Sequence, residues 1–264
     1  MIPLLITLPV IAYFSMIAFH SMNLTVVNYE GKLVPYSLGV IVLYSYAVLY
    51  AFPPYPLEAL SLSAFLYIIG IWLLGFIDDR FGKPYPKGLR GHIRYVTETR
   101  KITTGLLKAI GTIGFALLYL WTKQPNSFLL NLLSFFLLTG LPHTMNLFDT
   151  RPLRVWKASL VMTIVIFIGS PLPSFYFVVT IIAVYYILFV LEGHRKAMLG
   201  DNGATVIGAM LAIVFIHHTD LFVQIGVFFS ILFFILLAEK WSISTLIESW
   251  SMLRVIDQIG IVKK

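Results

Sequence analysis

The sequence predicts an all-α integral membrane protein, built as a polytopic bundle of about nine transmembrane helices. Of its 264 residues, 59% are hydrophobic and only 12% are charged, and the mean hydropathy is +0.89. A water-soluble domain of this length needs more polar surface than that to cover itself. The apolar residues also form runs close to the roughly 17–25 residues that a spanning helix requires. We therefore expect one membrane domain, residues 1–264.

Nine apolar runs are the candidate spans. They are Ile2–His20, Tyr36–Phe52, Leu57–Phe76, Thr103–Trp121, Phe128–Thr144, Ala158–Ile168, Phe175–Leu191, Thr205–Ile216 and Leu221–Leu237. Breakers such as Pro53-Pro54 separate them, and the sixth and eighth runs are short. The first run lacks a basic segment before it and a small-residue cleavage site, so we interpret it as a span and not as a signal peptide.

The basic residues orient these spans. If the nine runs alternate in direction, one set of connecting segments contains all but two of the 19 Lys and Arg residues. The exceptions are Lys108, inside a span, and Lys123, on the other side. The positive-inside rule then predicts an external N-terminus and a cytoplasmic C-terminus. It also predicts a basic cytoplasmic loop at 77–102 and a cytoplasmic tail at 239–264.

The predicted cytoplasmic segments also carry most of the acidic residues, among them Asp78, Asp79, Asp149, Glu192 and Asp201. Adjacent carboxylates at the C-terminal end of a helix add to its partial negative charge, so they require a cation nearby. The chain has no Cys, which leaves oxygen ligands and a hard cation, Mg²⁺ or Mn²⁺. The surrounding Lys and Arg suit a polyanionic substrate. We attribute the net charge of +7 to loops at the membrane surface and expect no nucleic-acid partner.

Five segments together resemble the motifs of a known family, in the order that the family has them. These segments are Asn28–Pro35 with Gly39, Gly75–Gly82, Gly105–Lys108, Asn146–Asp149 and Met198–Ala204. They resemble the polyprenyl-phosphate N-acetylhexosamine-1-phosphate transferases, also called glycosyltransferase family 4. That family includes phospho-N-acetylmuramoyl-pentapeptide transferase and the UDP-N-acetylglucosamine–undecaprenyl-phosphate transferases.

The resemblance implies a reaction, two substrates and a location. The expected reaction transfers a sugar 1-phosphate from a UDP-N-acetylhexosamine-type donor to a polyprenyl (undecaprenyl) phosphate and releases UMP. The active site would face the cytoplasm from a bacterial inner membrane, and the product would serve cell-envelope glycan synthesis such as that of peptidoglycan. Membrane lipids are further expected partners, and a homodimer is left open.

The resemblance also implies roles for individual residues. Mg²⁺ would be held by Asp201 and by Asp78 or Asp79, whose partner in the pair would position or deprotonate the acceptor phosphate. Asp149 and Lys108 complete the expected catalytic set. The expected substrate-binding residues are Asn28, Asn146, Arg90, His92, Arg151, Arg154 and Asn202.

Plainer interpretations of the same residues stay open at this point. The acidic pair would also fit a solvated turn beside Arg80, and Asp201 would fit an ordinary helix N-cap. Lys108 could extend its ammonium to the membrane surface. Arg90, His92 and Arg94 would suit anionic lipid headgroups as well as a substrate.

Two departures from the family pattern keep rival functions open. Pro152 stands where the family has a further acidic residue, and no counterpart of its histidine-bearing loop is present. The first rival is a catalytically degenerate relative that binds nucleotide or lipid-linked sugar as an assembly scaffold. The second is a transporter or lipid flippase, which would need more ionisable residues inside the spans than this chain has.

Overall fold

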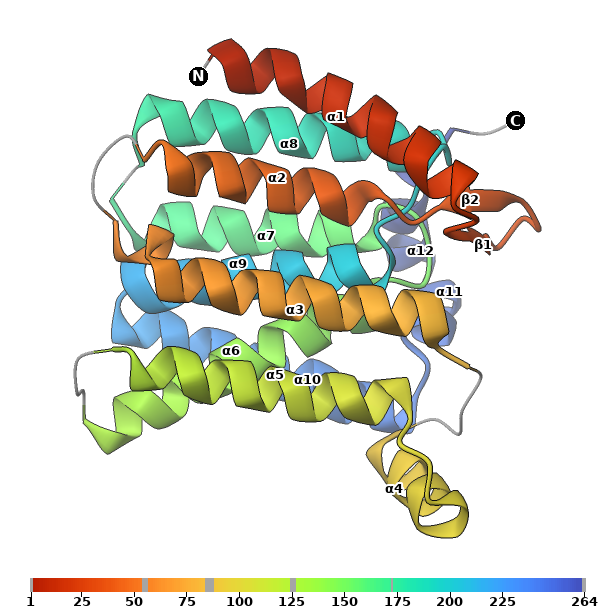
Figure 1. Ribbon diagram of the computed structural model, residues 1–264. Coiled ribbons are helices and arrows are strands. Elements are labelled where there is room, and N and C mark those ends of the chain that lie inside the picture. The colour runs from red at the N-terminus through yellow and green to blue at the C-terminus, as the bar shows by residue number, and fades with distance from the viewer. Residues whose placement is uncertain (1, 54–56, 84–87, 124–126, 172, 263–264) are drawn as a thin grey trace.

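In the computed structural model, the described residues include nine apolar helices that lie side by side and correspond one to one with the predicted runs (Figure 1). The structure describes residues 2–53, 57–83, 88–123, 127–171 and 173–262, without the side chains of residues 2, 88–90 and 92–94. The nine helices are α1 (Ile2–Ser21), α2 (Leu38–Ala51), α3 (Leu62–Phe81), α5 (Thr104–Trp121), α6 (Phe128–Phe148), α7 (Arg154–Gly169), α8 (Phe175–Gly193), α9 (Gly200–His218) and α10 (Leu221–Lys240).

The predicted fold class is confirmed. Among the described residues, seven helices are long and apolar enough to cross a membrane, and α2 is a shorter apolar helix of 14 residues. The eighth run, which looked short in the sequence, is the 19-residue α9. The sixth run, equally short, belongs to α7 with its 16 residues. Their polar first turns, which carry Asp201 and Arg154, hid part of each helix from the hydropathy pattern.

Helix α9 forms the centre of the bundle. Of its span residues, 72% are buried, a larger share than in any other described span. Glycines let its neighbours approach closely: a Cβ on Gly75 of α3 would lie 2.6 Å from the Cα of Asn202, and a Cβ on Gly208 would lie 2.6 Å from the Cα of Pro142 in α6. Any larger side chain at these positions would push α3 or α6 away from α9.

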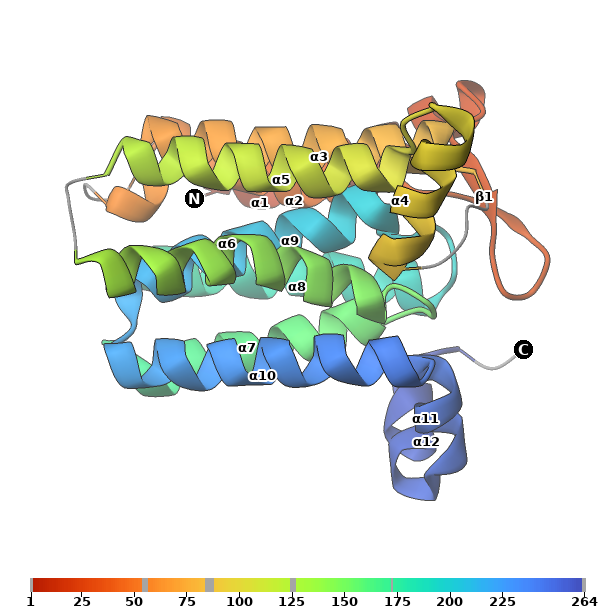
Figure 2. The same ribbon diagram turned by 90° about the horizontal axis from the view of Figure 1, so that it is seen from below.

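The two ends of the bundle differ in structure. One end, here called the basic end, holds the loops that the charge pattern assigned to the cytoplasm (Figures 1 and 2). Its additional elements are the antiparallel hairpin β1 (Thr25–Val27) and β2 (Leu33–Pro35), with Val26 opposite Val34, and the helices α4 (Gly88–Thr99), α11 (Ile243–Ser249) and α12 (Ser251–Gln258). The other end, here called the opposite end, carries the short 3-10 helix η1 (Glu58–Leu60).

Several helix boundaries at the basic end differ from the sequence-based prediction. Helix α3 continues five residues past Phe76, so Asp78 and Asp79 lie on its last turns instead of in a loop. Helix α6 ends at Phe148, which leaves Asp149 as its C-cap residue. The predicted tail contains α11 and α12. Hydropathy placed the boundaries where the polar residues begin, whereas contacts with other helices extend the helical segments.

Candidate active site

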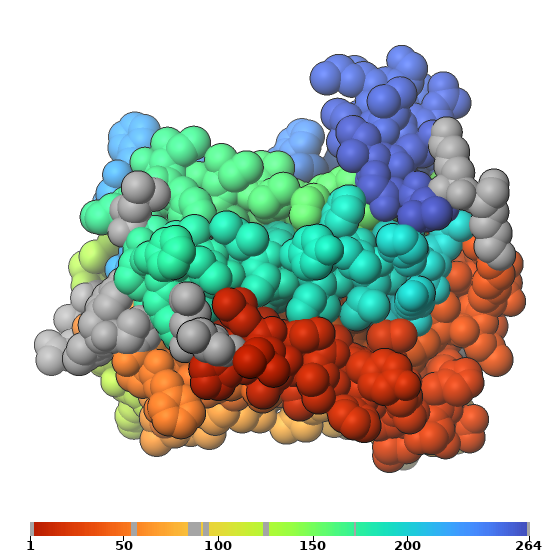
Figure 3. All heavy atoms as spheres, turned by 90° about the horizontal axis from the view of Figure 1, so that it is seen from above, coloured from red at the N-terminus to blue at the C-terminus, as the bar shows by residue number. Residues whose placement is uncertain are grey.

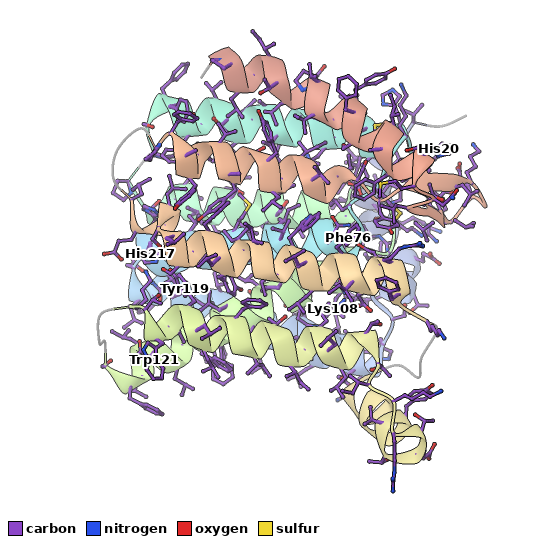
Figure 4. All side chains as sticks on the ribbon, viewed as in Figure 1. His20, Phe76, Lys108, Tyr119, Trp121 and His217 are labelled. Carbon is purple, nitrogen blue, oxygen red and sulfur yellow. The ribbon has the colours of Figure 1, made fainter. Side chains whose placement is uncertain are left out.

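Three charged side chains from three helices meet at the basic end. The Lys108 ammonium on α5 lies 2.6 Å from a carboxylate oxygen of Asp78 on α3 and also contacts a carboxylate oxygen of Asp201 on α9. The Lys108 side chain is only 17% exposed and lies between α5 and α3 (Figure 4). The ammonium is therefore directed into the bundle and does not extend to the membrane surface. Two carboxylates share one cation, so the cluster has a net negative charge.

The second member of the acidic pair has different partners. Both carboxylate oxygens of Asp79 accept backbone N–H groups from the start of α9, from Asp201 and Asn202, each at 2.9 Å. The Asn202 side-chain amide donates to Asp79 at 2.7 Å and to the Tyr36 carbonyl at 3.0 Å. Asp79 thus caps the N-terminus of α9 from another helix, where its charge complements the helix dipole. The sequence also allowed Asp201 to cap its own helix, but Asp79 takes that role.

A cavity of about 730 Å³ opens beside the charged cluster, between α5, α6 and α10. Asp78, Lys108, Asp201 and Asn146 line its polar part, as does His143. The rest of its wall is mostly apolar and includes Ile113, Phe136, Phe228, Ile231, Leu232 and Ile235. Figure 2 shows α6 between α5 and α10, which is the face on which this cavity lies. Four of the predicted site residues therefore line the polar part of a cavity whose remaining wall is mostly apolar.

Asp149 lies near this cluster but does not line the cavity. Burial raises its pKa well above the usual range of an aspartate, and the carboxyl groups of Glu192, Asp201 and Asp79 add to this effect, while Lys108 opposes it. Asn146 and Asp149 have the i, i+3 spacing that would place both on one face of a helix, but α6 ends at Phe148, one residue before Asp149. Asn146 lines the cavity, whereas Asp149 is the C-cap residue of α6 and is not part of the cavity wall.

Several predicted substrate-binding residues are engaged elsewhere. The Asn28 side chain accepts the N–H groups of Glu30 and Lys32 and so closes the turn of the β1–β2 hairpin. Arg151 pairs with Glu248 and lies over the Tyr29 ring.

Arg154 likewise has a structural position. Its buried guanidinium binds both carboxylate oxygens of Asp257 at 2.7 and 2.8 Å, and it also donates to Thr150 and Ser244. Arg154 therefore holds α12 against the start of α7, and it does not line the cavity. The side chains of Arg90, His92 and Arg94 lie outside the described residues.

Sequence reasoning missed His143 at the site, and it gave no role to Glu192, which it counted among the cytoplasmic acids. His143 precedes Asn146 by one helical turn, and this i, i+3 spacing could have placed both on one face. Glu192 is 2% exposed at the end of α8 and lies within hydrogen-bonding reach of the N–H groups of Leu153 and Leu199. It connects the loops that precede α7 and α9, and only its tertiary position reveals that role.

The residues at the cavity fit a magnesium ion. Among the described residues, no three His, Cys, Asp or Glu side chains group closely enough to enclose a metal. Mg²⁺ does not require such a cage, because one or two carboxylates usually hold it together with waters and substrate phosphates. Asp78 and Asp201 supply that donor set. The Asn146 Oδ1 atom, which is buried and has no hydrogen-bond partner, could accept from a metal-bound water.

Comparison with known proteins gave one family match. The family model described as "Glycosyl transferase family 4" matches residues 61–219, a segment that contains the acidic pair, Lys108, Asn146 and Asp201. The search of curated proteins gave no match. The matched segment covers more than half of the sequence and includes every residue of the charged cluster. The chain belongs to glycosyl transferase family 4.

Proposed function

We propose that the protein transfers a sugar 1-phosphate from a UDP-N-acetylhexosamine-type donor to undecaprenyl phosphate and releases UMP. Family membership implies phosphosugar transfer from a nucleotide sugar to a polyprenyl phosphate. The donor class, the undecaprenyl chain and a role in bacterial envelope glycan synthesis are the specific parts of the proposal. So is an active site on the cytoplasmic side of the inner membrane, which rests on the distribution of Lys and Arg.

One observation carries the proposal: the negatively charged cluster adjoins a cavity with a polar end and apolar walls. A polyprenyl phosphate has the same division, a charged head on a long apolar tail. The tail would lie between α5, α6 and α10, in contact with Ile113, Phe136 and Ile235. Its phosphate would then reach Lys108 and the carboxylates. A soluble phosphate acceptor would have no use for the apolar part of this cavity.

The chemistry follows from charge and position. An oxygen of the acceptor phosphate attacks the phosphorus that carries the sugar, the bond from that phosphorus to the UMP oxygen breaks, and UMP leaves. Phosphate monoesters have a second pKa of about 6, so the acceptor is largely ionised near neutral pH without a general base. Positioning and charge neutralisation then account for most of the catalysis.

The residues around the cavity would divide this work. Lys108 would bind phosphate oxygens, and Asp78 and Asp201 would hold Mg²⁺. When bound, Mg²⁺ would neutralise charge on the donor pyrophosphate. Asp79 would act as a positioning residue, because its oxygens already fix the start of α9 and with it Asp201. His143 would offer a ring nitrogen to the substrates at the same wall.

UMP release by the purified protein tests the proposal. The protein, reconstituted with Mg²⁺ and undecaprenyl phosphate, is offered a panel of UDP-sugars, and UDP-N-acetylhexosamines should give the fastest release. Asp78→Asn should lower the rate by about 100-fold or more, since it removes charge that acts on the transition state. Glu58→Gln, the same change in an acid at the opposite end, should leave the rate unchanged.

Two results would contradict the proposal. Full activity of Asp78→Asn would exclude this cluster as the reaction site. Nucleotide-sugar binding without UMP release, for every donor in the panel, would favour the rival interpretation, a non-catalytic scaffold.

A further inference from the structure

The helix α12 is inverted: its apolar stripe faces outward and an acidic residue faces the protein. Met252, Val255, Ile256 and Ile259 follow one another at helical spacing, and their exposed fractions are 73%, 64%, 42% and 58%. On the inner side, Asp257 is only 8% exposed. A helix that packs on a water-soluble surface has the reverse arrangement. The outward stripe must therefore meet something apolar.

We propose that α11 and α12 lie in the headgroup region of the adjacent membrane leaflet, with this stripe inserted toward the acyl chains. The orientation of α12 is fixed from inside the protein. The buried Arg154 guanidinium binds the Asp257 carboxylate through two hydrogen bonds, and the Lys157 ammonium donates to the Asp257 carbonyl at 2.7 Å. The helix therefore cannot rotate to hide its apolar stripe without breaking a buried ion pair.

The position of the two helices matches the membrane interface. They follow directly from the end of α10 and lie across the long axis of the bundle (Figure 2). In Figure 3 the C-terminal residues form a protrusion at one corner of the molecule. Phe229, Phe233 and Leu236 on α10 are also exposed, so the helix that leads into this protrusion carries exposed apolar side chains as well.

The other exposed side chains of this segment also suit the headgroup level of the membrane. Trp241 and Trp250, which flank α11, are 57% and 63% exposed, and tryptophan is enriched at the headgroup level of membranes. Lys240 and Arg254 are also exposed and would meet lipid phosphates. An amphipathic segment with aromatic and basic residues of this kind binds in the plane of the interface. The segment predicted as a cytoplasmic tail thus becomes part of the membrane-embedded surface.

Spin labels on single cysteines test this inference, since the natural chain has no Cys. The variants Met252→Cys and Ile259→Cys place the label on the outward stripe. Gln258→Cys, at an exposed position on another side of the same segment, is the matched control. The full-length protein is reconstituted in phosphatidylcholine–phosphatidylglycerol vesicles. Oxygen and a water-soluble nickel chelate, loaded on both sides by freeze–thaw, serve as the collision partners.

The labels at positions 252 and 259 should collide several times more often with oxygen than with the nickel chelate, and the label at 258 should show the reverse. Equal access of the nickel chelate to all three labels would overturn the inference, because the stripe would then face water. Spin–spin broadening at position 252 that disappears on dilution with unlabelled protein would also overturn it, because a second copy would then cover the stripe.

Discussion

Charged side chains connect the same three parts of the bundle at both ends, but the balance of charge differs between the two ends. At the basic end, α3, α5 and α9 contribute Asp78, Lys108 and Asp201. At the opposite end, η1 just before α3 contributes Glu58, the residues after α5 contribute Lys123, and α9 contributes His217. Figure 4 shows His217 and Tyr119 together at that end, away from Lys108.

The two ends differ in burial and in whether their charges balance. At the basic end two largely buried carboxylates share one lysine beside a cavity, which leaves negative charge available for a metal ion. At the opposite end one glutamate, 78% exposed, serves both a lysine and a histidine, and the Tyr119 hydroxyl lies 2.6 Å from the His217 ring. A charged contact between helices is therefore not by itself a sign of a binding site. Unbalanced charge beside a cavity is what distinguishes the basic end.

Removing the lysine from each end should give the largest difference in activity and stability between the two ends. Lys108→Met should lower UMP release by about 100-fold or more and should destabilise the fold by about 3–5 kcal/mol, because it leaves two carboxylates without their cation. Lys123→Met should cost about 1 kcal/mol or less, since its partner Glu58 is exposed to solvent. The UMP assay and thermal unfolding in detergent measure the two effects. Equal losses in both variants would show that the two ends do not differ in function.

The helix-capping aspartates should give a smaller difference. Asp79→Asn should lower the free energy of unfolding by about 1.5–3 kcal/mol, because an amide cannot accept all the N–H groups that the carboxylate now binds. Asp220 caps α10 at the opposite end by accepting the N–H of Val223, and Asp220→Asn should be close to neutral, since Asn caps about as well as Asp. Thermal unfolding checks both variants. A neutral Asp79→Asn would mean that α9 keeps its start without this contact.

The pH dependence of stability should give the smallest difference. Because burial beside Glu192 raises the pKa of Asp149 in the folded protein, the folded state holds a proton that the unfolded state has lost. The resulting stabilisation is complete below the ordinary aspartate pKa, about 4, and disappears as the pH rises through the raised value. Lys108 opposes the shift, and Asp201 and Asp79 add to it.

The Asp149→Asn variant has no carboxyl group to ionise at this position, so it should not lose stability in this way as the pH rises. Its unfolding temperature should decline less than that of the natural protein from acidic to alkaline pH, by a few degrees. Thermal unfolding of both proteins across a pH series measures this difference. If the unfolding temperatures of the two proteins change equally with pH, Asp149 ionises normally in the folded state.

Hydropathy predicted the number and order of the spans, but it missed details that depend on contacts between helices. The acidic pair looked like the end of a span, whereas α3 continues through Phe81 because Asp78 meets Lys108 and Asp79 meets the start of α9. Arg154 looked like a substrate ligand beside Asp149. Its actual partner, Asp257, is more than a hundred residues away in the chain, and no local pattern connects the two.

By itself, the sequence determined that the chain enters a membrane, how its segments alternate and which end carries the acids. These properties follow from transfer free energies and charge distribution, which are sums over residues and need no knowledge of contacts. Only the tertiary structure decided which acids share Lys108, which one caps α9, and that α12 faces outward with its apolar side. Those outcomes depend on the distance and burial of groups far apart in the chain, and both quantities exist only once the helices have packed.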